Sequence, residues 1–140
     1  MKYVSVVIPL RKQGLKWQAW VQLRREDGPL DGFLEFPGGK IEANESALEA
    51  AVRELAEEVH LTISENDLKL FQIINHAYSD RHVCLNFHLL NVTSENDAWS
   101  IGEWFDLEAL LQQKLLEANV LVLKNLINFV ASEPSLGEWA

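Results

Sequence analysis

Residues 39–61 read GKIEANESALEAAVRELAEEVHL, and this stretch carries the strongest structural signal in the chain. Its apolar residues recur at spacings of three and four, namely Leu48, Ala51, Val52, Leu55 and Val59. That spacing predicts an amphipathic helix over residues 45–59. Asn44 comes directly before it, and we expect its side-chain oxygen to cap the helix N-terminus.

Three glutamates gather on the polar side of this predicted helix. Glu54, Glu57 and Glu58 share one face near its C-terminal end. Like charges at such spacings repel by roughly 0.2–0.5 kcal/mol per pair, and the helix dipole disfavours anions there by about 0.3–1 kcal/mol each. Only Arg53 is nearby to compensate. A bound divalent cation would remove this penalty, and carboxylates without His or Cys favour Mg²⁺ or Mn²⁺ over zinc. The alternative is a solvated acidic face.

Pro37-Gly38-Gly39 precedes the helix by a short loop. Glycines let a backbone carbonyl or amide approach a metal or a phosphate closely. A Gly-Gly pair alone is weak evidence, but its fixed distance from three carboxylates strengthens the metal-site interpretation.

Together these residues resemble the Nudix box, G-x5-E-x7-R-E-U-x-E-E-x-G-U, in which U is a bulky aliphatic residue. The positions that fall on the pattern are Gly39, Glu45, Arg53, Glu54, Leu55, Glu57, Glu58 and Leu61. His60 stands where the pattern has its last glycine. We expect His60 to form a slightly strained left-handed helix cap without loss of activity.

Segments outside the box are similar to the MutT group of Nudix enzymes. They are LEFPGGKIE at 34–42, DRH at 80–82, GEW at 102–104 and EAN at 117–119, in the same order and with similar spacing. The resemblance implies hydrolysis of oxidised purine nucleoside triphosphates such as 8-oxo-dGTP to the monophosphate and pyrophosphate. It implies one Nudix domain over residues 1–140, with a tail that frays after about 133. The implied fold is α/β, a mixed β-sheet sandwiched between helices (α/β/α).

The resemblance also implies a metal site. Glu54, Glu57 and Glu58 would bind Mg²⁺, or Mn²⁺ in its place, with help from the Gly38 backbone carbonyl. Arg53 completes the catalytic set, and we expect it to orient the glutamates by salt bridges.

Two further box residues, Gly39 and Glu45, are expected to support the metal ligands, Glu45 by pairing with other box residues.

The identity of the general base stays open. Glu54 is one candidate, and the MutT-like alternative is a loop glutamate before the GEW strand. Here that loop, SENDAWSI at 94–101, is shortened, and its carboxylates are Glu95 and Asp97.

Asn119 is the candidate reader of the nucleobase. Its side-chain amide offers both donors and an acceptor, so it can pair with a purine edge. The alternative is an ordinary helix N-cap, because Asn119 directly precedes the apolar residues, beginning at Val120, of the helix predicted over residues 117–130.

Four of the remaining substrate-binding candidates have a second interpretation. Phe36 and Tyr78 would stack on the base, or else pack as core aromatics. Asp80 and Arg81 would contact the ligand, or else form a solvated surface turn. Arg24 would contact phosphate or sugar.

Alternating apolar and polar residues, and runs of β-branched residues, predict strands at 3–10, 17–23, 34–36, 68–77, 82–92 and 101–105. Strands mixed with helices indicate an α/β layered domain. The five tryptophans are expected to serve packing, with Trp104 the main core member.

Composition limits the function. The 140 residues include 12 Lys+Arg and 21 Asp+Glu, a formal charge of -9. This argues against nucleic acid as a partner, because phosphate contacts need clustered cations; a small nucleotide that arrives with a metal remains compatible.

No apolar run reaches membrane-span length, and the N-terminus lacks a signal-peptide pattern. Cys84 is the single cysteine, which indicates a reducing compartment and a cytoplasmic location. The chain is expected to be a monomer or homodimer.

Two other functions stay open. One is Nudix hydrolysis of another nucleotide, a pyrimidine triphosphate or an RNA 5′ end. The other is a non-catalytic Nudix domain that senses a nucleotide, although such domains usually lose box glutamates and all three are present here.

Overall fold

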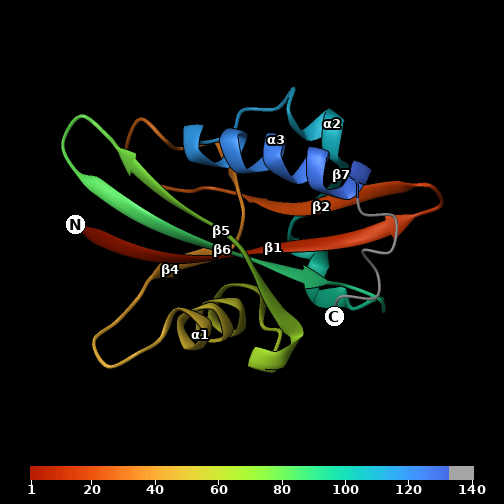
Figure 1. The fold of residues 1–140 in the computed structure, drawn as a ribbon, viewed down its shortest axis with the longest axis horizontal. Helices are drawn as coiled ribbons and strands as arrows, with labels where there is room; N and C mark the ends of the chain where they lie inside the picture. The colour runs from red at the N-terminus through yellow and green to blue at the C-terminus, as the bar shows by residue number, and fades with distance from the viewer. Residues whose placement is uncertain (133–140) are drawn as a thin grey trace. The chain divides into compact units, whose positions relative to one another are not determined.

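A computed structural model describes residues 1–132, and Figure 1 shows its ribbon. The expected fraying after residue 133 falls outside the described residues. In chain order the elements are β1 (Lys2–Gln13), β2 (Lys16–Leu23), β3 (Leu34–Glu35), β4 (Gly38–Lys40), α1 (Ala47–Val59), the 3-10 turn η1 (Glu65–Asp67), β5 (Leu68–Ala77), β6 (His82–Asn91), the 3-10 turn η2 (Asp97–Ile101), β7 (Glu103–Asp106), α2 (Leu107–Leu110) and α3 (Glu117–Ser132). The expected α/β class is confirmed.

The chain forms two compact units, and β1 contributes to both. The first unit comprises residues 1–8 and 37–90. The second comprises residues 9–36 and, within the described part, 91–132. No helix in residues 1–132 is long and apolar enough to cross a membrane.

The first unit holds helix α1 against a small antiparallel ladder. The start of β1 pairs with β4, with Val6 opposite Gly38 and Ser5 opposite Gly39. β5 and β6 form a long hairpin in the same unit. The buried face of α1 comprises Ala50, Ala51, Leu55 and Val59. These residues fall at helical spacings, so the opposite face of α1 is left to its charged residues.

The second unit is built on β2. β2 pairs antiparallel with the second half of β1, with β3 and with β7. Trp20 is fully buried, and its indole Nε1 donates to the carbonyl of Trp99 at 2.8 Å. A Cβ on Gly102 would overlap the Trp20 ring, which explains the glycine of the GEW segment. The expectation that Trp104 leads the core was wrong, because Trp104 is half-buried beneath the Arg11 guanidinium, 4.4 Å from the ring centroid.

Helix α1 begins two residues later than expected, and the Asn44 cap was wrong. Ser46 is the N-cap: its side chain accepts from the Glu49 amide at 3.0 Å, and the Glu49 carboxylate accepts from the Ser46 amide at 2.9 Å. This reciprocal capping box satisfies two unpaired amides, where Asn44 could satisfy only one. Asn44 instead adopts a φ of 64° ahead of the helix.

The C-terminal end of α1 agrees with the sequence expectation. His60 has φ 61° and ψ 35°, which is the left-handed region, and its amide donates to the Ala56 carbonyl at 3.1 Å. Histidine tolerates this conformation at some cost where glycine would adopt it freely.

Candidate active site

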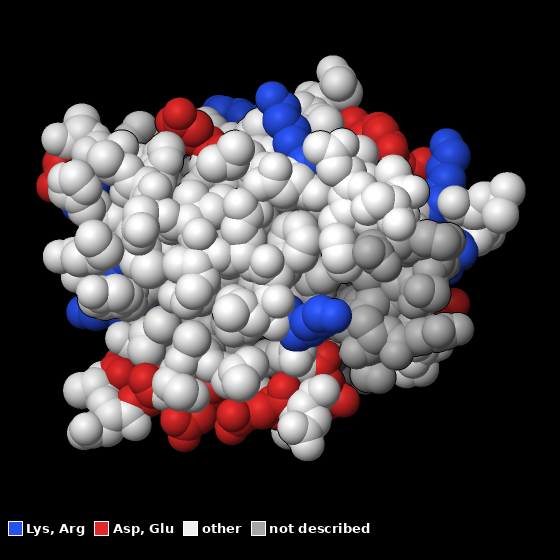
Figure 2. Space-filling model, viewed as in Figure 1, with Lys and Arg blue, Asp and Glu red and all other residues white. Residues whose placement is uncertain are grey.

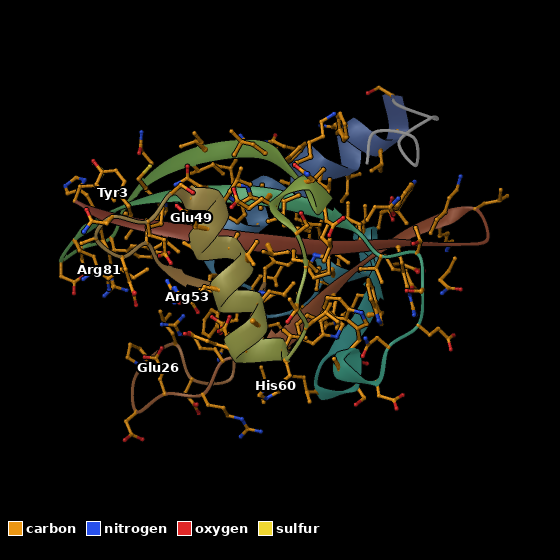
Figure 3. The ribbon with its side chains drawn as sticks, turned by 90° about the horizontal axis from the view of Figure 1, so that it is seen from below. Tyr3, Glu26, Glu49, Arg53, His60 and Arg81 are labelled. Carbon is orange, nitrogen blue, oxygen red and sulfur yellow. The ribbon has the colours of Figure 1, made fainter. Side chains whose placement is uncertain are left out.

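The three box glutamates lie on the polar face of α1. Figure 2 shows acidic side chains gathered along the edge where α1 and η1 lie in Figure 1. The Glu54 side chain is only 15% exposed, whereas the Glu57 side chain is 60% exposed. Figure 3 shows Glu49, Arg53 and His60 following one another along the helix. The site therefore combines one sheltered and one open carboxylate within a single helical turn.

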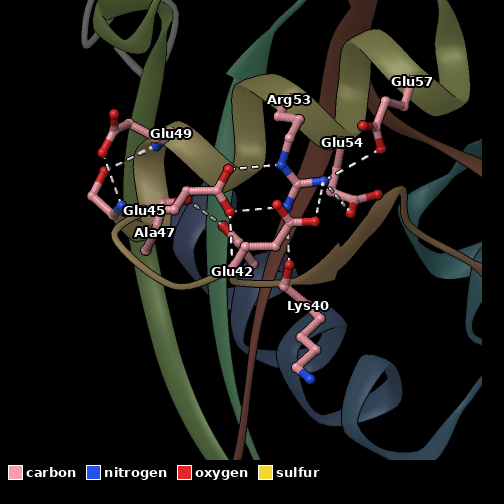
Figure 4. Close-up of polar contacts among 10 residues, drawn as sticks. Lys40, Glu42, Glu45, Ala47, Glu49, Arg53, Glu54 and Glu57 are labelled. Atoms are coloured by element: carbon pink, nitrogen blue, oxygen red, sulfur yellow. Dashed lines mark hydrogen bonds and ion pairs between the residues drawn. The ribbon is translucent and has the colours of Figure 1, made fainter.

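Arg53 is the centre of a dense ion-pair network (Figure 4). Its Nε and Nη2 donate to the two oxygens of Glu45, at 2.7 and 2.9 Å. Its Nη1 donates to Glu54 Oε1 at 2.9 Å and to Glu57 Oε2 at 3.3 Å. Nη2 also donates to the Lys40 carbonyl at 3.0 Å. One guanidinium thus ties the loop before α1 to two of the expected metal ligands.

These contacts change the ionisation of both partners. The hydrogen bonds from Arg53, together with the Glu42 amide, lower the pKa of Glu45 to about 2. The Glu45 carboxylate, and then Glu54, raise the pKa of Arg53 further above its ordinary value. Both side chains therefore stay charged across the neutral range.

Glu45→Gln is expected to lower the thermal midpoint at neutral pH, and the difference from the wild type should vanish in acid. The folded pKa of Glu45 is about 2, below its ordinary value of 4.5. The ion pair therefore stabilises the fold above about pH 5 and is lost as pH falls through about 2. Thermal denaturation at a series of pH values between about 7 and 2 measures this. Glu108→Gln is the control, because Glu108 is exposed and has no ion pair in the described residues. If both variants showed the same dependence of the thermal midpoint on pH, the stabilising role of the Glu45–Arg53 ion pair would be contradicted.

Glycines bring β4 close to both β1 and α1. The Gly38 amide donates to Glu58 Oε2 at 2.8 Å. A Cβ on Gly38 would overlap the Ser5 carbonyl, and a Cβ on Gly39 would overlap the Glu54 carboxylate. Neither position has room for a side chain without movement. Gly38–Lys40 form the short strand β4, which was not among the strands predicted from the sequence.

The residues at this site fit a divalent cation in their chemistry. Glu54, Glu57 and Glu58 supply only carboxylate oxygens, which Mg²⁺ and Mn²⁺ prefer, and the missing side chain at Gly39 lets the Glu54 carboxylate lie against the β4 backbone. Within residues 1–132 no group of three His, Cys, Asp or Glu side chains already stands in an arrangement that could hold an ion. Glu57 is the group with freedom to turn, because it is exposed and held by one 3.3 Å contact.

The DRH turn also lies in the first unit. The Arg81 guanidinium stands over the Tyr78 ring, 5.2 Å from its centroid, and the Tyr78 amide donates to the Arg81 carbonyl at 2.8 Å. Asp80 is 73% exposed and lies 4.0 Å from Arg81. In this structure the three residues form a surface turn, and their contact with a ligand stays a prediction.

The second unit carries the other substrate candidates. Asn119 lies inside the first turn of α3, which begins at Glu117, so its interpretation as an N-cap was wrong. It is 6% exposed. Arg24 is held by Glu26 and, at 2.9 Å, by Glu35. Burial raises the pKa of Glu35. Phe36 is buried, as a core aromatic would be.

Sequence reasoning missed the contributions of Lys40 and Glu42. The Lys40 carbonyl accepts from Arg53, Glu42 Oε1 lies 3.8 Å from Arg53 Nη1, and the Glu42 amide donates to Glu45 at 3.0 Å. A backbone carbonyl leaves no residue-type signal. Glu42 could have been noticed as a further acidic residue three positions before Glu45.

Comparison with known proteins identifies the family of the chain. The NUDIX domain family model matches residues 1–126. The chain is 35% identical over 113 residues to the 8-oxo-dGTP diphosphatase of Escherichia coli (strain K12), covering 78% of this chain and 85% of that protein. It is 33% identical over 79 residues to the U8 snoRNA-decapping enzyme of Homalodisca vitripennis, covering 56% of this chain and 38% of that protein. A mutT/nudix family protein from Listeria innocua has a similar structure, with a TM-score of 0.72 and 24% identity over 96% of this chain and 97% of the other.

The chain therefore belongs to the NUDIX domain family. As the resemblance implied, the fold is the Nudix fold, with a mixed sheet and helices. The protein is a Nudix hydrolase that acts on nucleoside diphosphate-linked substrates, and hydrolases of this family use divalent metal cations.

Proposed function

We propose that this protein is a Mg²⁺-dependent nucleoside triphosphate pyrophosphohydrolase that prefers oxidised purine nucleotides such as 8-oxo-dGTP. The observation that carries the proposal is the complete acidic box on α1, organised by Arg53, in a chain 35% identical to an 8-oxo-dGTP diphosphatase over most of both lengths. Single-cysteine composition and a nucleotide substrate support a cytoplasmic location.

The proposed reaction breaks one phosphoanhydride bond. Water adds to the β-phosphorus, the bond to the oxygen bridging the α- and β-phosphates breaks, and the nucleoside monophosphate leaves. Pyrophosphate then carries the new oxygen. The divalent cation, when bound, supplies positive charge against the polyphosphate and promotes ionisation of water.

Residues of α1 and β4 would hold the cation in place. Glu54, Glu57 and Glu58 would bind the cation, and the Gly38 carbonyl would assist. Arg53 restrains Glu54 from one side, which limits the number of positions its carboxylate can take. Gly38 restrains Glu58 through its amide. Two of the three ligands are therefore oriented before a cation arrives, which lowers the reorganisation required on binding.

A second substrate class follows from one comparison. The similarity to the snoRNA-decapping enzyme covers 56% of this chain and raises the 5′ end of RNA as a candidate. The formal charge of -9 weighs against it, because RNA backbones bind through clustered cations. Release of capped nucleotides from RNA faster than pyrophosphate from 8-oxo-dGTP would favour this alternative.

Asn119→Ala is expected to reduce the preference for 8-oxo-dGTP over dGTP by about 5- to 100-fold. The proposed role of Asn119 is to pair with the base edge, and losing a buried polar reader costs on the order of 1–3 kcal/mol of preference. The variant should keep its metal dependence, because the proposed metal ligands lie on α1 and not on α3. Measuring kcat/KM for both nucleotides tests the preference.

Asn125→Ala, on the same helix, is the matched control and should leave the ratio unchanged. A constant ratio in Asn119→Ala, whether or not its thermal midpoint falls, would remove Asn119 as the base reader.

A further inference from the structure

Two buried polar side chains in the first unit have no part in the proposed chemistry. Ser5, on β1, is 0% exposed, and His88, on β6, is 2% exposed. Neither stands in a motif, and both are surrounded in sequence by apolar residues. Buried polar groups are costly unless they are hydrogen-bonded, so the bonds that these two side chains make need explanation.

Their hydrogen bonds form one chain that ends on α1. Ser5 Oγ lies 2.6 Å from the carbonyl of Ala47, the first residue of α1, and 3.1 Å from His88 Nε2. A carbonyl can only accept, so the single hydroxyl proton of Ser5 goes to Ala47. His88 Nε2 must therefore donate to Ser5, which fixes the neutral tautomer with its proton on Nε2. Nδ1 then has no partner in the described residues.

Ser5 also contacts β4, the strand that carries Gly38 and Gly39. It pairs with Gly39 in the β1–β4 ladder, and its carbonyl lies where a Gly38 side chain would be. The backbone of Ser5 thus contacts β4 while its side chain holds the start of α1. Gly38 in turn donates to Glu58 at the far end of that helix.

Helix α1 is consequently held at three points along its length. Ser5 holds Ala47 at the N-terminal end, the Lys40 carbonyl receives Arg53 in the middle, and the Gly38 amide holds Glu58 near the C-terminal end. The three glutamates follow Ala47 by seven to eleven residues, which is about 10–16 Å along a helix. Because backbone hydrogen bonds join these residues into one helix, a displacement of the first turn of α1 also displaces the three carboxylates.

We propose that Ser5 and His88 are positioning residues, which fix the start of α1 on β1 and so set the placement of Glu54, Glu57 and Glu58. The inference rests on the proposed role of these glutamates as cation ligands. His88 acts through Ser5: its donated hydrogen bond orients the hydroxyl toward Ala47.

The test is the affinity for Mn²⁺, measured by electron paramagnetic resonance on the full chain without nucleotide. Ser5→Ala is expected to weaken Mn²⁺ binding about tenfold or more and to lower kcat in parallel, since supporting partners of metal ligands commonly have effects of 10- to 100-fold. Asn86→Ala is the matched control. Asn86 lies on the same strand as His88 and donates to the Val4 carbonyl at 3.3 Å, but it does not contact α1 through that bond. It should leave Mn²⁺ affinity within twofold of the wild type.

Two variants of His88 keep the test decisive if Ser5→Ala fails to fold. His88→Phe keeps the ring volume but removes the donor, and it should weaken Mn²⁺ binding severalfold. His88→Gln places an amide donor the same number of bonds from the backbone, and it should restore wild-type affinity. The double variant Ser5→Ala/His88→Phe should be no weaker than Ser5→Ala alone, because residues that act as one unit are not additive.

The outcomes separate this inference from the proposed function. Mn²⁺ affinity within twofold of the wild type in both Ser5→Ala and His88→Phe, with thermal midpoints lowered as in Asn86→Ala, would make the pair merely structural and overturn the inference. A wild type that binds Mn²⁺ but hydrolyses no nucleoside triphosphate would overturn the proposed function alone. A wild type that binds no Mn²⁺ would overturn both.

Discussion

Hydrolysis of nucleoside triphosphates by this protein is expected to stop completely in excess chelator and to return when Mg²⁺ or Mn²⁺ is added. The physical reason is charge. Glu54, Glu57 and Glu58 meet a substrate that is itself strongly negative, and Arg53 is already shared among Glu45, Glu54 and Glu57. Without a cation, the triphosphate would approach an acidic surface with no counter-charge. Pyrophosphate release, measured before and after the metal is restored, tests this.

The control for this experiment is the fold in chelator. Helix α1 is held by the capping box at Ser46, by Arg53 and by Ser5, none of which needs a metal. The far-ultraviolet circular dichroism should therefore be unchanged when the metal is removed. Full turnover in excess chelator would contradict the metal assignment, and a loss of helix would make the metal structural.

Glu57→Gln is expected to lower kcat by at least about a hundredfold while the fold is retained. Removing one ligand weakens stabilisation of charge in the transition state, and interactions of that kind are worth roughly 3–4 kcal/mol. Its contact with Arg53 is exposed, and exposed ion pairs contribute about 0–1 kcal/mol to stability. The thermal midpoint without metal should therefore stay within about 4 °C of the wild type. Steady-state kinetics and a melting curve measure the two effects separately.

Glu49→Gln is the matched control, because Glu49 lies on the same helix but serves the capping box. Glutamine can take the same place in that box, so both activity and stability should be close to the wild type. A Glu57→Gln variant with wild-type kcat would show that Glu57 is not a ligand. A fall of many degrees in its melting temperature would show that its contact with Arg53 is structural.

The acidic helix could be predicted because its signals are local. Spacings of three and four place the glutamates on one face whatever the rest of the chain does, and the structure keeps them opposite Leu55 and Val59. The left-handed His60 followed from the resemblance, because His60 stands at the last glycine of the Nudix box, where a helix cap is expected. The N-terminal cap was missed although its signal was local too. Asn44 and Ser46 are both good caps, and only Glu49, three residues after Ser46, decides between them.

Features that depend on distant parts of the chain could not be predicted. Trp20 and Trp99 are buried while Trp104 is half-exposed, and this follows from the pairing of β2 with β7, which one sequence does not reveal. The salt bridges of Arg53 to Glu45, Glu54 and Glu57 were expected from the resemblance, but its hydrogen bond to the Lys40 carbonyl was not, because a backbone carbonyl leaves no residue-type signal. Ser5 and His88 are 83 residues apart, and nothing near either of them marks the bond that they form.

The central claim is tested most directly by identifying the products formed from a panel of nucleotides with Mg²⁺ present, in the wild type and in Glu57→Gln. The panel holds 8-oxo-dGTP, dGTP, a pyrimidine triphosphate and a capped RNA. The account predicts a nucleoside monophosphate and pyrophosphate from 8-oxo-dGTP, with the highest kcat/KM of the panel, and loss of at least about 99% of that activity in Glu57→Gln. Release of orthophosphate instead of pyrophosphate, absence of turnover with every triphosphate, or equal turnover by Glu57→Gln would contradict it.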